Sequence, residues 1–223
     1  MGIIIRGRRR AFGNGGRKAG AWLWLLGVAL GVVILVGIIL AVLLLRRPAP
    51  PAQPTKGNPA APITIEEFTD FRCGYCTLFA LDIAGQLDRD YVETGRVKLV
   101  FRNFPVGGAT SELAAQAGEC AHEQGKFWAY HDRLFEESAK RRGLFGPEDL
   151  KGWAREVGLN GQSFDQCLDS GRYAEEVRAD HEEGRSKGVR GTPTFFIGEE
   201  VLEGVAPYPQ FKAMIDAELG QKE

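Results

Sequence analysis

Hydrophobic and polar residues follow two different patterns along this chain. Residues 22–45 form an unbroken apolar run without a single charge, whereas residues 63–220 show the shorter periodicities of a globular domain. At about 1.5 Å per residue, a helix over the apolar run would be roughly 36 Å long, which is enough to cross a hydrocarbon core of about 30 Å. The run therefore predicts a single transmembrane helix.

From residue 63 onward the pattern predicts an α/β domain. Residues 63–71 and 97–102 have the apolar, β-branched or alternating composition of strands, and the apolar residues between them recur at helical spacing. Two strands joined by one helix favour a parallel, right-handed βαβ unit. Residues from about 108 to 188 are predicted to be mostly helical, and two short strands and an amphipathic helix follow.

The segment between the apolar run and this domain is rich in proline. Six prolines lie between residues 48 and 62, and proline is excluded from helix interiors and central strands. We therefore predict that residues 46–61 form an extended, semi-rigid linker and that residues 62–220 form the domain. Residues 1–21 are rich in Gly and Arg without apolar periodicity, and we expect a disordered basic tail.

The distribution of charge orients the predicted membrane helix. Residues 1–62 contain nine Lys or Arg and no acid; six of these bases precede the apolar run, and only Arg46 and Arg47 follow it closely. The positive-inside rule then places the N-terminus in the cytoplasm and the domain outside it, at the cell membrane. A cleaved signal peptide is the alternative, although its apolar core is usually only about 7–15 residues long.

The domain itself is acidic. Residues 63–223 hold 19 bases against all 29 acids, a net charge of −10. Nucleic-acid binding depends on neutralising phosphates with basic side chains. We therefore expect no nucleic-acid partner.

The sequence Cys73-Gly74-Tyr75-Cys76 is the candidate reactive site. It follows the first predicted strand directly and precedes a helix, a position typical of redox-active cysteine pairs. At the start of a helix, unpaired N–H groups and the helix dipole stabilise a thiolate, which is the form that attacks disulfides. The second cysteine, one turn along, is within reach to resolve a mixed disulfide.

This constellation resembles the thioredoxin superfamily, and within it the DsbA-like thiol–disulfide oxidoreductases, over about residues 62–220. The strongest matching stretches are residues 68–76, which read Phe-Thr-Asp-Phe-Arg-Cys-Gly-Tyr-Cys, and residues 191–196, which read Gly-Thr-Pro-Thr-Phe-Phe. The resemblance implies a thioredoxin-like fold with an inserted helical domain. It also implies an enzyme that needs no cofactor and no metal.

The resemblance also implies roles for individual residues. Cys73 would be the exposed nucleophile and Cys76 the more buried resolving cysteine. Thr192-Pro193 would form a cis-proline loop whose backbone pairs with an extended substrate. Glu67, six residues before Cys73, matches a partly buried acid that moves protons at the second cysteine; the alternative is a glutamate that faces water.

The dipeptide between the cysteines departs from the pattern of the strong oxidants in this family. It is Gly74-Tyr75, whereas those oxidants often carry Pro-His. One source of thiolate stabilisation is therefore missing, which leaves the direction of electron flow open. Tyr75 is expected either to contact a substrate or to cover the disulfide.

The remaining cysteines, Cys120 and Cys167, both fall in the predicted helical insertion. Their flanking residues resemble positions at which some DsbA-like proteins carry a second disulfide, so the resemblance implies a structural Cys120–Cys167 bond. Two buried free thiols and a redox-active second pair are alternatives. A zinc site formed by all four cysteines is a further one, although zinc ligands usually come from two close pairs.

Taken with the predicted anchor, these features give a leading hypothesis and two alternatives. The leading hypothesis is a monomeric, membrane-tethered oxidase that introduces disulfides into thiol-containing exported proteins. The family implies reoxidation by a DsbB-like or vitamin K epoxide reductase-like membrane partner. The alternatives are an extracytoplasmic disulfide reductase or isomerase, and a non-enzymatic metal chaperone or assembly protein.

Overall fold

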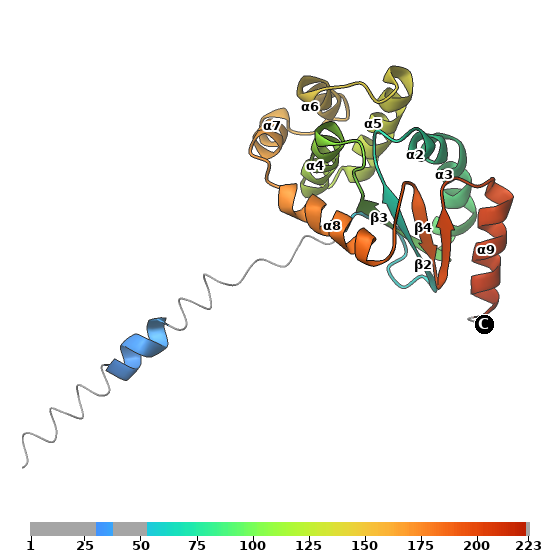
Figure 1. Ribbon diagram of the computed structural model, residues 1–223, viewed down its shortest axis with the longest axis horizontal. Helices are drawn as coiled ribbons and strands as arrows, with labels where there is room; N and C mark the ends of the chain where they lie inside the picture. The colour runs from blue at the N-terminus through green and yellow to red at the C-terminus, as the bar shows by residue number, and fades with distance from the viewer. Residues whose placement is uncertain (1–29, 38–52, 222–223) are drawn as a thin grey trace, which may run out of the picture. The chain divides into compact units, whose positions relative to one another are not determined.

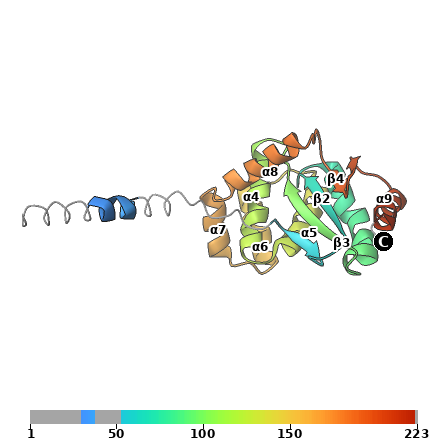
Figure 2. The same ribbon diagram turned by 90° about the horizontal axis from the view of Figure 1, so that it is seen from below.

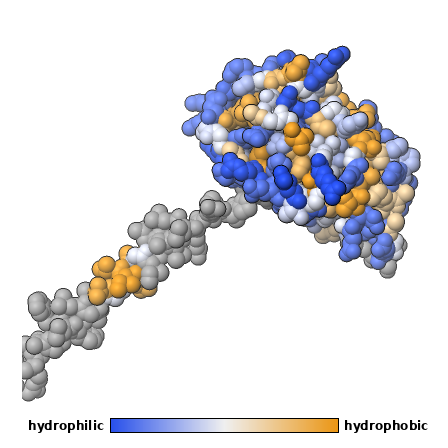
Figure 3. Space-filling model, viewed as in Figure 1, coloured by the Kyte–Doolittle hydropathy of each residue, from blue (hydrophilic) through white to orange (hydrophobic). Residues whose placement is uncertain are grey.

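The computed structural model describes residues 30–37 and 53–221, in two units that divide at residues 50 and 51. Residues 30–37 are helical and apolar, with exposed side chains (Figure 3). Within these two described ranges, no helix has both the length and the apolar character needed to cross a membrane. The predicted basic tail and most of the predicted membrane helix over residues 22–45 lie outside the described residues.

The second unit is built on a five-stranded sheet with the order β1-β3-β2-β4-β5 (Figure 1). The central strand β2 pairs in parallel with β3, which confirms the predicted βαβ unit. β2 also pairs with β4, β4 with β5, and β3 with β1, all antiparallel. The strands are β1 (Thr55–Gly57), β2 (Ile63–Thr69), β3 (Val97–Asn103), β4 (Thr194–Ile197) and β5 (Glu200–Glu203).

The helices follow the predicted order. A continuous helical segment joins β2 to β3: α2 (Gly74–Leu78), the π-helical turn η1 (Phe79–Ile83), α3 (Ala84–Leu87) and the π-helical turn η2 (Asp88–Val92). The insertion between β3 and β4 contains α4 (Ala109–Glu123), α5 (Phe127–Arg141), α6 (Pro147–Glu156), α7 (Gly161–Asp169) and α8 (Ala174–Ser186). The chain then closes with α9 (Tyr208–Gly220). Figure 2 shows α4–α7 and α9 on opposite sides of the sheet region.

Alternate residues of β2 pack on opposite faces of the sheet. Ile63 and Ile65 belong to a core that includes Phe79 and residues of α9. Phe68, on the other face, packs against Phe104, Val189 and Phe196. Because side chains alternate along a strand, Glu67 and Thr69 share the face of Ile63 and Ile65 and point toward the helix that carries the CxxC motif.

The predicted linker over residues 46–61 is wrong in its C-terminal half, which contains a strand. Residues 55–57 form the edge strand β1, and the backbone N–H of Phe101 donates to the carbonyl of Pro54. Trp128 Nε1 also donates to the carbonyl of Thr55 at 2.9 Å. The prolines on either side do not prevent this strand, because proline is tolerated next to an edge strand. The folded domain therefore begins before residue 62.

Candidate active site

Cys73 lies where β2 gives way to α2. It is the N-cap residue of α2, in an extended conformation with φ −75° and ψ 124°. Its backbone N–H donates to the carbonyl of Asp70 at 3.0 Å. Phe71 fixes this connection, because its buried ring packs against Phe101 and Phe135 with centroid distances of 5.3 and 5.0 Å. A buried anchor two residues before Cys73 thus sets the position of the first sulfur.

Asp70 and Arg72 hold the same connection in place with polar contacts. Asp70 accepts from the backbone N–H groups of Arg72, Val106 and Gly107 at 2.8, 2.8 and 3.1 Å. Arg72 donates to the carbonyls of Gly143 and Gly107, both at 2.8 Å. Sequence reasoning missed these two residues, although an aspartate two residues before an N–H is a usual Asx-turn signal.

The cis-proline loop contacts the first sulfur. The Thr192–Pro193 peptide bond is cis, and the Cys73 sulfur lies 3.3 Å from the backbone carbonyl oxygen of Thr192, to which it donates only when it is protonated. Segments 119 residues apart in sequence are therefore brought together at Cys73. The predicted site residues Cys73, Thr192 and Pro193 form one cluster.

Cys73 and Cys76 are both free thiols with very different environments. Cys73 is half-buried and Cys76 is fully buried. A hydrogen bond from the Cys76 thiol is the largest cause that lowers the pKa of Cys73 to about 5. The side chain of Thr192 and then the backbone N–H groups of Cys76 and Tyr75 add to it. Burial, together with the neighbouring Cys73, raises the pKa of Cys76 above its ordinary value. At neutral pH the pair therefore holds one thiolate, on Cys73.

Glu67 lies on the core side of β2, with only 2% of its surface exposed. It lines a cavity of about 230 Å³ whose walls also include Lys56, Asp88 and Asp132. Burial raises the pKa of Glu67 to about 8. Its Oε1 is buried and accepts no hydrogen bond from the described residues. The water-facing alternative for Glu67 is therefore wrong. A neutral carboxylic acid lies beside a cavity with a mixed polar and apolar lining.

Thr69 is a second residue that sequence reasoning missed. It is buried, and its side chain lowers the pKa values of both Cys76 and Glu67. Its Oγ1 makes no hydrogen bond of normal geometry within the described part of the chain. A hydroxyl between a thiol and a carboxyl can pass a proton between them. The alternation of β2 is the signal that could have identified it, because Thr69 is two residues after Glu67.

We expect that Glu67→Gln will increase stability at alkaline pH. The pKa of Glu67 is raised on folding, so its favourable contribution is complete below about pH 4.5 and is lost as pH rises through about 8. At pH 9 the variant should be more stable than the unmodified chain by roughly 4 kcal/mol, and at pH 5 the two should be similar. Urea unfolding at both pH values measures this difference.

Glu66→Gln is the matched control on the opposite face of β2. Burial alone would raise the pKa of Glu66, but the ion pairs with Lys187 and Arg102 lower it. The contribution of Glu66 is therefore lost as pH falls, and its replacement should not stabilise the chain at pH 9. Equal stability of Glu67→Gln and the unmodified chain at pH 9 would contradict a buried, proton-holding Glu67.

Tyr75 lies at the surface next to Cys73. Its side chain is 68% exposed, and Leu78 and Leu81 on the following turns are also partly exposed. Most of the ring surface is therefore open to solvent. It is available to a polypeptide that approaches Cys73.

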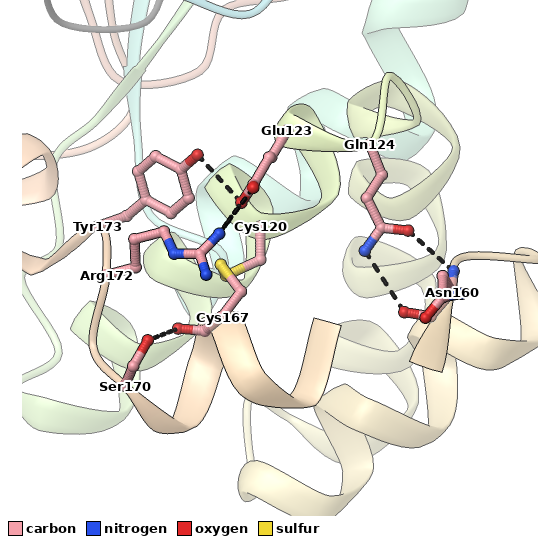
Figure 4. Close-up of a disulfide and its surroundings, with 8 residues drawn as sticks. All are labelled: Cys120, Glu123, Gln124, Asn160, Cys167, Ser170, Arg172 and Tyr173. Atoms are coloured by element: carbon pink, nitrogen blue, oxygen red, sulfur yellow. Dashed lines mark hydrogen bonds and ion pairs between the residues drawn. A yellow bond between two sulfur atoms is a disulfide. The ribbon is translucent and has the colours of Figure 1, made fainter. Parts of the chain in front are cut away.

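Cys120 and Cys167 form a disulfide that joins α4 to α7 (Figure 4). Their Cα atoms are 5.9 Å apart and both side chains are buried. Polar contacts flank the bond: Glu123 pairs with Arg172 at 2.6 Å, and Asn160 N–H donates to Gln124 at 2.8 Å. The bond matches the pairing implied by the resemblance. It is incompatible with free thiols at these positions and with a four-cysteine zinc site.

Comparison with known proteins agrees with this geometry. Residues 50–217 match the thioredoxin family. Disulfide bond formation protein D of Bacillus subtilis (strain 168) is 30% identical over 184 residues, which cover 79% of this chain and 81% of that protein. The oxidised crystal structure of BdbD from Bacillus subtilis has a TM-score of 0.72 at 29% identity, covering 78% of this chain and 96% of that chain.

A further solved structure shows the same fold at lower identity. Alpha-DsbA1 from Wolbachia pipientis has a TM-score of 0.69 at 24% identity, covering 79% of this chain and 95% of that chain. The family match begins at residue 50, in agreement with the place of β1 inside the domain. From its fold, its cysteine pair and these relatives, the chain belongs to the thioredoxin family and is a DsbA-like thiol–disulfide oxidoreductase.

Proposed function

We propose that this protein is a membrane-tethered oxidase that introduces disulfides into exported proteins through Cys73 and Cys76. The observation that carries the proposal is the place of Cys73 at the N-terminus of α2, where the Cys76 thiol, the Thr192 side chain and backbone N–H groups lower the pKa of Cys73 to about 5. A stabilised thiolate stabilises the reduced enzyme relative to its disulfide, which makes the disulfide a stronger oxidant. The relative from Bacillus subtilis is itself described as a disulfide bond formation protein.

The reaction moves two electrons from the substrate to the enzyme. The substrate loses two thiol protons; one balances the proton that Cys76 takes up, and the other stays in solvent because Cys73 remains a thiolate. A substrate thiolate attacks Cys73 of the enzyme disulfide, the Cys73–Cys76 bond breaks, and Cys76 leaves with the electron pair and takes up a proton. A second substrate thiolate then attacks the substrate sulfur of the mixed disulfide and releases Cys73. The products are a substrate disulfide and an enzyme with both cysteines reduced.

The two sulfurs are suited to these steps. Cys73 is a good leaving group in the second step because the pKa of its thiol is about 5. Cys76 is buried and its pKa is raised, so it requires a proton when it leaves. Glu67, with a pKa of about 8, holds that proton at neutral pH, and Thr69 lies on the same face of β2 to pass it on.

The Gly74-Tyr75 dipeptide is compatible with this direction. No histidine lies between the cysteines to stabilise the Cys73 thiolate, but the Cys76 thiol and two backbone N–H groups stabilise it. Helix N-termini provide such N–H groups whatever the side chains are. The reductase and isomerase alternatives lack an observation of this kind.

Substrate binding is assigned to the backbone at Thr192 and to Tyr75. The carbonyl oxygen of Thr192 lies 3.3 Å from the Cys73 sulfur, so a chain that reacts with Cys73 passes along this loop. An extended substrate can pair with the loop as a strand pairs with a sheet edge. The exposed ring of Tyr75 offers contact area beside the same sulfur.

Tethering and reoxidation complete the proposal. The apolar run over residues 22–45, with six bases before it, supports a membrane anchor with a cytoplasmic N-terminus. The reduced enzyme passes two electrons to a membrane partner, DsbB-like or vitamin K epoxide reductase-like. In this arrangement the anchor keeps enzyme and partner in the same membrane.

An oxidation assay with the full chain tests the proposal. The oxidised protein should convert a reduced, unfolded two-cysteine substrate to its disulfide within minutes, with one enzyme disulfide consumed per substrate disulfide formed. Mass spectrometry of alkylated samples counts the thiols on both partners. The opposite transfer, in which the reduced chain reduces the substrate disulfide to completion, would favour a reductase instead.

A further inference from the structure

A cavity of about 460 Å³ lies beside the cis-proline loop. Its size falls within the range of about 300–1,000 Å³ that is usual for binding pockets. Two loops and one helix form its walls, and none of the lining residues is acidic. The lining residues are Phe104, Val106, His181, Arg185, Gly188, Val189 and Arg190.

The floor of this cavity is apolar and fixed. Phe104 and Val189 are buried and pack with Phe68 of the central strand. The ring of His181 meets the ring of Phe104 edge-on, with centroids 4.4 Å apart. Val189 N–H donates to the carbonyl of Gly184 at 2.9 Å, which ties the loop to the end of α8. The cavity is therefore a preformed feature of the fold.

The rim is cationic. Arg185 and Arg190 are exposed and form no ion pair with the described residues. Lys187, which lies between them in sequence, is instead paired with Glu66 and Glu183. Two unpaired guanidinium groups on an acid-free cavity are unusual in a domain with a net charge of −10. Guanidinium groups bind carboxylates in a bidentate manner.

The cavity lies close to the point where a substrate would react. Arg190 is two residues before Thr192, whose carbonyl oxygen lies 3.3 Å from the Cys73 sulfur. Residues of an extended chain are about 3.3 Å apart, so two or three residues span roughly 7–10 Å. A polypeptide that pairs with Thr192 can therefore place a nearby side chain in the cavity.

We propose that this cavity is a specificity subsite that binds an acidic side chain two or three residues from the reacting cysteine of the substrate. The carboxylate pairs with Arg185 and Arg190, and the methylene groups of the side chain contact Val106 and Phe104. This inference rests on the proposed oxidation of polypeptide substrates, whose preferred sequence it specifies.

Paired peptides test the subsite. Each pair consists of two reduced two-cysteine peptides that are otherwise identical. One carries Glu and the other Gln at the positions two and three residues from the first cysteine. One pair places these residues on the N-terminal side of that cysteine, and a second pair places them on its C-terminal side. The second-order rate constant for oxidation by the full-length oxidised chain is measured for each. We expect the Glu peptide to react about fivefold faster than its Gln partner on one of the two sides, and this ratio to fall toward one in 0.5 M salt.

Charge variants assign the preference to the cavity. The double variant Arg185→Gln/Arg190→Gln should bring the Glu-to-Gln ratio close to one. The double variant Arg185→Lys/Arg190→Lys should keep part of the preference for the Glu peptide. Arg89→Gln removes an exposed charge on η2, outside the cavity lining, and should leave the ratio unchanged.

Two results would overturn the subsite: equal rates for the Glu and Gln peptides with the unmodified chain, or a Glu preference that persists in the double glutamine variant. The proposed function fails separately, if none of the peptides is oxidised. In that case the subsite is tested by the Glu-to-Gln ratio of the rate constants with which the chain reduces the disulfide forms of the same peptides.

Discussion

Replacing Cys73 with serine is expected to abolish thiol–disulfide exchange, with a loss of at least about a thousandfold in rate. Serine keeps the size of the half-exposed side chain but provides no thiolate, and the thiolate is the reacting species. The other sulfur cannot replace it, because Cys76 is buried and its pKa is raised. The rate of oxidation of a reduced two-cysteine substrate measures the loss.

Cys76→Ala gives the complementary result. In this variant the Cys73 thiolate attacks a substrate disulfide, one substrate sulfur leaves as a thiolate, and the mixed disulfide that results can no longer be broken by Cys76. Incubation with disulfide-containing substrates should therefore accumulate covalent complexes on non-reducing gels. Alanine avoids a buried, unpaired hydroxyl at a position with no exposed surface. Full activity of Cys73→Ser, or mixed disulfides that form through Cys76 instead, would contradict the assigned roles.

Removing the Cys120–Cys167 disulfide is expected to lower the free energy of unfolding by about 4 kcal/mol. The bond closes a loop over a sequence separation of 47 residues, and in the chain-entropy model this loop gives that magnitude. Cys120→Ala/Cys167→Ala replaces both buried sulfurs with small apolar groups. For a domain of this size, the midpoint of thermal unfolding should fall by about 10 °C.

The same variant distinguishes a structural bond from a redox relay. If the bond only joins α4 to α7, the reduction potential of the Cys73–Cys76 pair should not change. Arg172→Ala is a matched control, because it removes the partly exposed ion pair with Glu123 beside the bond and should lower stability by less than about 1 kcal/mol. A changed potential at Cys73–Cys76, with little loss of stability, would indicate a second redox pair.

Much of the fold and of the site could be predicted from local pattern. The CxxC motif after a strand, the Thr192-Pro193 dipeptide before another strand, and the long helical insertion each carry a signal within a few residues. The alternation of Ile63 and Ile65 also indicates the side of β2 on which Glu67 lies. These features depend on residue type and spacing, which are visible in the sequence.

Other features depend on tertiary contacts. β1 is only three residues long, and it exists because β3 offers it an edge and Trp128 donates to it. The role of Asp70 arises from N–H groups of Val106 and Gly107, more than 30 residues away. The thiolate on Cys73 was expected from its place at a helix start, but the contribution of the Thr192 side chain, 119 residues away, depends on the tertiary fold.

The reduction potential of the full-length chain tests most directly whether the protein acts as an oxidant. Equilibration in glutathione buffers of known potential, followed by alkylation and mass spectrometry, gives the fraction of reduced Cys73–Cys76 at each point. A stabilised Cys73 thiolate predicts a value closer to the roughly −120 mV of DsbA than to the roughly −270 mV of thioredoxin. A thioredoxin-like potential would contradict the oxidase and favour a reductase.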